Sequence, residues 1–310
     1  MRSSALIRAI LAPIRAKPPV SLDRLSGSIF AYDYRRLEGL CDAKALAAYT
    51  QRTRTLFAPT ATTFDDRRNT EWLLRSYLAL KLILHATIMA TSAGYARDRN
   101  LRVATPYLIY YTLFSACRAF LLTCPDVSWK GAATAHFSHA GAITLAVDLL
   151  KRLDPKVSAQ ASTQLLAAKS QRELFSYAFP MSGPRDLGTQ RISLDDAIAL
   201  AGAFAELAHL NTACLEGAVS KHQKGRTFGL IEDQAWELMS HALEGGEEHF
   251  DAGDWAWLGR LFRDHTAPVA LTALAAQGMT EDFFGGWSAS DEVEGAYDPD
   301  DDWRILLDVW

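Results

Sequence analysis

The stretch TPYLIYYTLFSACRAFLLTCP, residues 105–125, indicates the architecture of this chain. Thr105 can cap a helix, Pro106 suits its first position, and Pro125 ends it. An aromatic stripe at helical spacing forms the kind of apolar seam that a helical bundle needs, and it comprises Tyr107, Tyr110, Tyr111 and Phe114. We therefore expect this stretch to be a helix packed within a bundle.

Composition favours helices along the rest of the 310 residues. Hydrophobic residues make up 49% and charged residues 22%, which is enough for a large core, and there are only 11 Pro and 19 Gly. The sequence has no internal repeat, no convincing alternating strand pattern and no glycine-rich phosphate loop, so nucleotide binding through such a loop is unsupported. We predict an all-α fold with further helices near residues 35–55, 70–93, 136–153, 158–179, 193–220, 231–243 and 255–277, the last kinked or restarted at Pro268.

Turn-rich segments divide the chain into four parts. Residues 1–69 form an N-terminal arm with a short helix, and residues 70–181 form an up-down four-helix bundle. The linker PMSGPRDLGTQ then precedes a second helical segment, residues 193–280, and an acidic tail, residues 281–310.

Four cysteines occur in or beside apolar runs without a CxxC pair, which is typical of reduced structural thiols: Cys41, Cys117, Cys124 and Cys214. The N-terminal residues are basic and amphipathic without a secretory hydrophobic region, although an organellar presequence would look similar. Lys81 and His85 interrupt the longest apolar run, which favours a buried core helix over a membrane span. We expect a cytoplasmic protein with no membrane partner.

The tail 281–310 is strongly acidic. It holds ten acidic residues against the single Arg304, while the rest of the chain is mildly basic. Such a block is most often a solvated tail. The alternative is that it docks on a basic surface of its own chain or of a partner.

Residues 71–180 resemble the HEPN family of small helical bundles. The resemblance rests on YYTLFSACRAFLL, on the histidines of HFSHAG at the start of the third helix, and on SQRELFSY in the fourth. HEPN proteins include ribonucleases and non-catalytic binding modules, and the ribonucleases carry an arginine-to-histidine motif on a late helix, usually paired across a dimer. At the corresponding place this chain has Arg172 followed by Tyr177. A phenol with a pKa near 10 is a poor general base at neutral pH, so the resemblance favours a binding role for this bundle.

GRLFRDH provides an arginine-to-histidine spacing elsewhere, at Arg260 and His265. The histidine could take the 2′-hydroxyl proton of RNA and the arginine could stabilise the phosphorane. On a regular helix the two side chains would diverge by about 140° unless the helix ends or bends there. Random placement also yields about two such matches in a chain of this composition. Their alternative roles are a surface arginine–aspartate pair and a capping histidine.

The loop SKHQKGRTFG is a candidate nucleic-acid contact. It gathers Lys221, Lys224 and Arg226, which could contact phosphates, with Phe228, which could stack on a base. It could equally be the basic end of a helix.

Possible metal ligands are sparse, and we expect neither a metal site nor a cofactor. His136 and His139 form an HxxH that lacks further ligands nearby, and capping or packing roles suit them better. A second group reads as a solvated acidic turn: His241, Glu244, Glu247, Glu248 and His249. A third lacks the glycine and closing glutamate of a calcium loop: Asp298, Asp300 and Asp302.

These patterns favour a non-catalytic helical interaction module of a prokaryotic multi-protein system, of the defence or toxin–antitoxin type. It would assemble with itself or with a partner protein. The alternatives are a metal-independent ribonuclease acting as a toxin or antiviral effector, and a protein that binds RNA without cleaving it.

Overall fold

The computed structural model describes residues 22–28, 32–128, 138–181, 192–240, 250–288 and 295–307. These residues contain helices and no strands, which confirms the all-α prediction. The long helices are α4 (Ala43–Thr62), α5 (Asp66–Asp98), α6 (Thr105–Thr123), α8 (His139–Leu150), α9 (Pro155–Glu173), α10 (Leu194–Gln223), α11 (Glu232–Ser240) and α12 (Ala252–Asp264). The short helices are α2 (Leu22–Ser26), α3 (Arg35–Leu40), α13 (Leu271–Leu274) and α14 (Thr280–Gly285), with π-helices at Leu174–Ala178 and Ala275–Met279 and a 3-10 helix at Pro299–Ile305.

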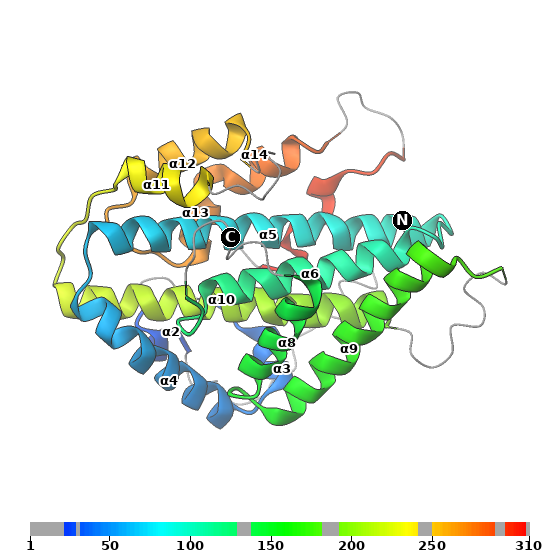
Figure 1. Cartoon of the computed structure of the whole chain (residues 1–310), viewed down its shortest axis with the longest axis horizontal. Coiled ribbons are helices and arrows are strands. Elements are labelled where there is room, and N and C mark those ends of the chain that lie inside the picture. Colours follow the sequence, from blue (N-terminus) through cyan, green and yellow to red (C-terminus); the bar gives the residue numbers. More distant parts are fainter. Residues whose placement is uncertain are drawn as a thin grey trace.

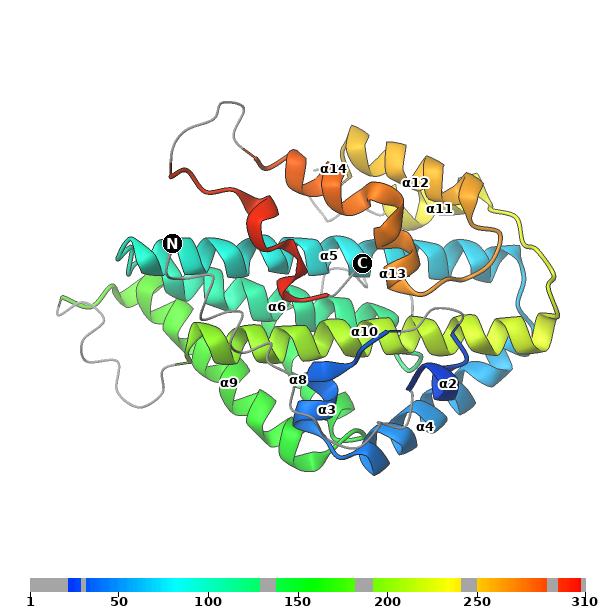
Figure 2. The same cartoon turned by 180° about the vertical axis from the view of Figure 1, so that it is seen from behind.

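Three long helices, α5, α6 and α10, form the centre of the molecule (Figure 1). On one side of them lie α4, α8 and α9, and α11, α12 and α14 lie along the other side of α5 (Figures 1 and 2). The buried apolar residues form one cluster that extends from Leu22 to Leu307. Helix α10, which begins the predicted second segment (193–280), packs on α6 of the predicted bundle (70–181) and on α4. The two predicted parts therefore share one core.

Capping side chains mark the starts of several helices, whereas α6 starts after Ala104, one residue before the expected cap Thr105, without a side-chain cap. The side chain of Asp65 accepts a hydrogen bond from the backbone N–H of Arg68, so α5 begins four residues before the predicted start, and it continues past Gly94 to Asp98. Ser138 caps α8 by accepting from the N–H of Gly141. The predicted interruption at Pro268 is confirmed, since α12 ends at Asp264 and α13 begins at Leu271.

A partly buried ion pair joins α12 to α5. Lys81 Nζ lies 2.6 and 2.7 Å from the two carboxylate oxygens of Asp254, and the Tyr77 hydroxyl donates to the same carboxylate. Asp254 also forms a capping box with Asp251 at the start of α12. The charge of Lys81 in the apolar run thus has a structural partner in the C-terminal third of the chain.

Two helices in the described part of the chain are long and apolar enough to cross a membrane, a test that buried core helices also pass. They are α5 and α10, and 78% and 89% of their most apolar windows are buried inside the fold.

The described part of the acidic tail lies against its own chain. Arg99 donates to the carbonyl of Gly295, the Tyr297 hydroxyl contacts Thr91 and the carbonyl of Ile88, and Leu306 and Leu307 are buried. These contacts use backbone carbonyls, a phenol and apolar side chains rather than the tail's carboxylates.

Glu206 is the most deeply buried acidic side chain of α10 with described contacts. It is 1% exposed and accepts hydrogen bonds from the backbone N–H groups of Arg36 (3.2 Å) and Leu37 (2.9 Å). Burial raises the pKa of Glu206 to about 7, although Arg36 and the two N–H groups oppose the shift.

We predict a pH-dependent stability contribution from Glu206. Because its folded pKa lies above the ordinary value of 4.5, its contribution is complete below pH 4.5 and is lost as the pH rises through 7. Glu206→Gln should therefore gain roughly 3 kcal/mol of unfolding free energy relative to wild type between pH 4.5 and 8. Urea unfolding at several pH values measures this, with the exposed Glu237→Gln as control. A difference that does not change with pH would contradict it.

Candidate functional site

One face of α6 carries aromatic rings and an arginine at helical spacing. Tyr110, Phe114 and Arg118 follow each other at intervals of four residues, so they lie in a row along the helix. The rings of Tyr110 and Phe114 are 5.7 Å apart and stacked, and the guanidinium carbon of Arg118 lies 5.6 Å from the Phe114 ring centre. These three side chains form one side of the candidate site.

His139, the first residue of α8, lies against this row. Its ring stacks on Phe114 at 4.3 Å and on Tyr110 at 5.5 Å, and its Nδ1 forms a hydrogen bond with the Tyr110 hydroxyl. The pKa of His139 is lowered by burial and then by the positive charges of Arg172, Arg118 and Lys169. The imidazole is therefore neutral at pH 7.

Arg172, from the last turn of α9, completes the cluster. Its guanidinium carbon lies 5.8 Å from the centre of the Tyr110 ring, and hydrogen bonds with Tyr111 and Tyr177 raise its pKa. We refer to Tyr110, His139, Arg118 and Arg172 as the tyrosine–histidine–arginine cluster. A second imidazole, His85 of α5, lies near Arg118 and forms a 2.9 Å hydrogen bond with Ser115.

The chemistry of the cluster is suited to an anion. Two guanidinium groups supply positive charge and directed N–H donors. Burial raises the pKa of Tyr110, so its phenol keeps its proton and can donate it to Nδ1 of His139. A neutral imidazole that accepts at Nδ1 carries its own proton at Nε2. In this tautomer His139 is a hydrogen-bond donor toward a ligand, whereas acting as a base at Nε2 requires the opposite tautomer.

Exposed apolar side chains gather at the same end of the molecule. Beyond Arg172 the chain forms a π-helix, and Tyr177 is 79% exposed and Phe179 65% exposed. Figures 1 and 2 place this end of α9 and the turn between α5 and α6 at the same end of the bundle. We call the following five exposed residues the α9-end surface: Leu101, Val103, Tyr177, Phe179 and Met181.

The predicted pair Arg260 and His265 has other partners. Arg260 lies 3.7 Å from Asp264, with its guanidinium 4.9 Å from the Trp257 ring centre. His265 is the C-cap residue of α12, only 9% exposed, and its Nε2 lies 2.8 Å from the side-chain nitrogen of Gln277. Arg260 is thus placed as in the alternative of a surface arginine–aspartate pair. His265 is placed as in the alternative of a capping histidine.

The predicted nucleic-acid loop is divided between surface and core. Lys221, Lys224 and Arg226 are exposed at the C-terminal end of α10, and Lys224 ends that helix in the left-handed conformation. Phe228 is 3% exposed and packs edge-on against Phe64, 4.9 Å between ring centres. Its ring forms part of the core and cannot stack on a base. The candidate phosphate contact is therefore limited to the three basic residues.

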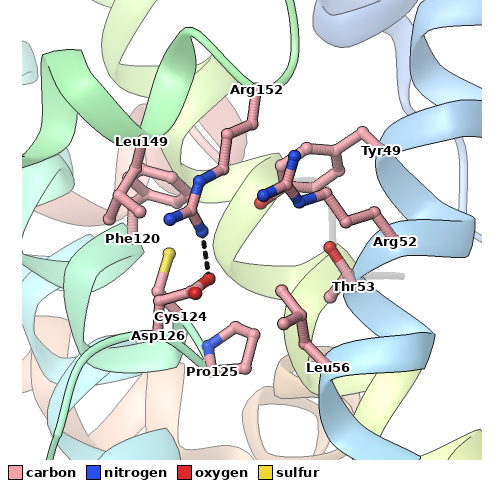
Figure 3. Close-up of a pocket in the computed structure, with 10 residues that line it drawn as sticks. All are labelled: Tyr49, Arg52, Thr53, Leu56, Phe120, Cys124, Pro125, Asp126, Leu149 and Arg152. Carbon is pink, nitrogen blue, oxygen red and sulfur yellow. Dashed lines mark hydrogen bonds and ion pairs between the residues drawn. The ribbon is translucent and has the colours of Figure 1, made fainter.

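A shallow pocket lies where the loop after α6 meets α4 (Figure 3). Arg152 pairs with Asp126 there, and Arg52 projects toward the same space from α4. The thiol of Cys124 is buried beside Asn211, and burial raises its pKa. The pocket thus offers two arginines, one of them paired with Asp126, and a buried thiol with a raised pKa.

The three groups considered as possible metal ligands fall wholly or partly outside the described residues. His136, His241, Glu244 and the residues 247–249 are outside, as is the side chain of Asp302. Among the described residues no group of three or more histidine, cysteine or acidic side chains could hold a metal ion. All four cysteines are buried and unbridged, as predicted.

The chain matches no protein-family model, no curated protein and no solved structure. The tyrosine–histidine–arginine cluster was not predicted as a unit. The sequence motifs single out Tyr110 in the aromatic stripe, His139 in HxxH and Arg172 in RELFSY, but not Arg118.

We predict that the positive charge of Arg172 lowers the pKa of His139. Replacing Arg172 with Ala removes a positive charge near the imidazole, so the pKa of His139 should rise toward its ordinary value of 6.5. NMR titration of the ring C–H signals measures this. Arg172→Lys keeps the charge and should leave the pKa lowered. An unchanged pKa in the Ala variant would contradict the assignment.

Proposed function

We propose that this protein is a non-catalytic helical interaction module that self-associates through the α9-end surface. The observation that carries the proposal is the grouping of five exposed apolar side chains at one end of the bundle. Tyrosine, phenylalanine and methionine are enriched in protein interfaces, where they supply apolar area. A surface of this kind suits a symmetric pair, in which each copy presents the same patch to the other.

The same end carries SQRELFSY, one of the motifs on which the resemblance to HEPN proteins rests. We include a HEPN-like bundle formed by α5, α6, α8 and α9 in the proposal. Its support is the convergence of the three quoted motifs, since Tyr110, His139 and Arg172 meet although they come from different helices. Pairing of two copies at the α9 end would bring their two clusters toward each other, as in the HEPN dimers that the resemblance implies.

Sedimentation velocity or light scattering over a concentration series tests the self-association. We expect wild type to dimerise, and Tyr177→Ser with Phe179→Asn to weaken dimerisation at least about tenfold through loss of two aromatic contacts. Asparagine suits position 179 because the backbone there is left-handed, with φ of 38°.

Trp287→Ser is the matched control, because Trp287 is also an exposed aromatic, 64% accessible, but lies at the end of α14. It should leave dimerisation unchanged. A wild-type chain that stays monomeric at all concentrations, or a control variant with an equal effect, would refute the α9-end surface as an interface.

The second candidate is a metal-independent ribonuclease, and a specific observation favours it. His139 stands near Arg172, so a base and a cation are present although Tyr177 replaces the histidine of the family motif. Against it stands the contact of His139 Nδ1 with the Tyr110 hydroxyl: when the hydroxyl donates, the imidazole carries its proton at Nε2 and cannot act as a base there.

Incubation with total RNA and EDTA decides between the two. As a non-catalytic module, the chain should leave RNA intact. As a ribonuclease, it should lose cleavage in His139→Ala and Arg172→Ala but keep it in His265→Ala. Loss of cleavage in His265→Ala alone would move the active site to α12.

A further inference from the structure

A polar stripe runs along the face of α10 that the N-terminal segment covers. Glu206, His209 and Glu216 lie on this face at helical spacing, and each is at most 4% exposed. Burial lowers the pKa of His209 to about 3, and neither of its ring nitrogens has a hydrogen-bond partner in the described structure. Burying polar groups in this way costs free energy that a fully apolar helix face would not.

Residues 22–28 and 32–40, which we call the N-terminal strap, cover this stripe. Tyr34 stacks on the His209 ring with centres 5.7 Å apart, and Tyr32 lies tilted against it at 4.3 Å. Ser28 donates to Glu216 at 2.8 Å, and the amides of Arg36 and Leu37 donate to Glu206. The strap also buries the side chains of Leu22, Tyr34 and Leu37, so lifting it exposes apolar surface as well as breaking these hydrogen bonds.

Glycines on α10 allow the strap to cross at two points. A Cβ at Gly217 would lie 2.4 Å from the carbonyl oxygen of Ser26. A Cβ at Gly202 would lie 2.2 Å from Cδ and Nε of Arg36, so the Arg36 side chain passes directly over the α10 backbone.

Beyond Gly202 the Arg36 guanidinium reaches the C-terminal segment. It donates to the carbonyl of Leu306 at 3.1 Å and to that of Ile305, and it lies 3.7 Å from Glu206. Figure 2 shows α3 and the C-terminal segment approaching α10 from opposite sides. One side chain thus joins the strap, α10 and the C-terminal segment.

We infer that Arg36 is a latch that makes the N-terminal strap and the C-terminal segment 295–307 open together, uncovering the polar stripe of α10. Opening returns Glu206, His209 and Glu216 to water, which offsets part of the lost hydrogen bonding, so this opening costs less than global unfolding. The coupling is reciprocal: anything that binds the released C-terminal segment also frees the strap.

Hydrogen exchange of the full chain, followed by mass spectrometry at neutral pH, tests the latch. In Arg36→Ala, exchange should rise about tenfold in peptides from both residues 32–40 and residues 295–307, while peptides from α6 stay protected as in wild type. Arg35→Ala is the matched control, since Arg35 is on the same helix but is exposed and pairs with Asp33.

Gly202→Ala tests the same contact from the α10 side, because the added methyl displaces Arg36. It should reproduce the joint opening. Faster exchange in only one of the two segments, an equal rise in α6, or an Arg35→Ala effect as large as that of Arg36→Ala would overturn the inference.

Discussion

The buried carboxylate of Glu206 is the constraint on which the arrangement of both chain ends depends. A carboxylate that has left water must find donors, and Glu206 finds them in the amides of Arg36 and Leu37. This places the start of α3 on α10. The same arginine then continues across Gly202 to the carbonyls of Ile305 and Leu306. Glu206 thus positions Arg36, and Arg36 in turn holds Ile305 and Leu306, which lie more than 250 positions away in the sequence.

Other polar contacts fix the long helices relative to one another. Asn211 of α10 accepts from the Tyr49 hydroxyl of α4 and donates to Thr123 at the end of α6. Arg75 of α5 donates to the backbone carbonyls of Leu122, Cys124 and Val127, at the end of α6 and in the turn that follows it. Apolar burial holds the helices together without direction, and these bonds set their register.

Association and catalysis, the two proposed functions, concern the same end of the bundle. The tyrosine–histidine–arginine cluster arises because α9 runs back along α6, which places Arg172 beside Tyr110, while Ser138 starts α8 so that His139 faces the same rings. A histidine contributed by a neighbouring helix can replace one missing from a linear motif. This is why the absence of histidine at Tyr177 does not by itself decide between a binding module and an enzyme.

The amino-acid sequence by itself determined the all-helical class, most helix positions and the break at Pro268, because these depend on local capping residues, prolines and apolar periodicity. It also identified Lys81 and His85 as marks of a core helix, but not their partners Asp254 and Ser115. The core burial of Phe228, the contact of His265 with Gln277, and the meeting of Tyr110 with His139 and Arg172 were decided only by the tertiary structure. Those features depend on which helices pack side by side, and contacts between residues tens to hundreds of positions apart leave no signal in local spacing.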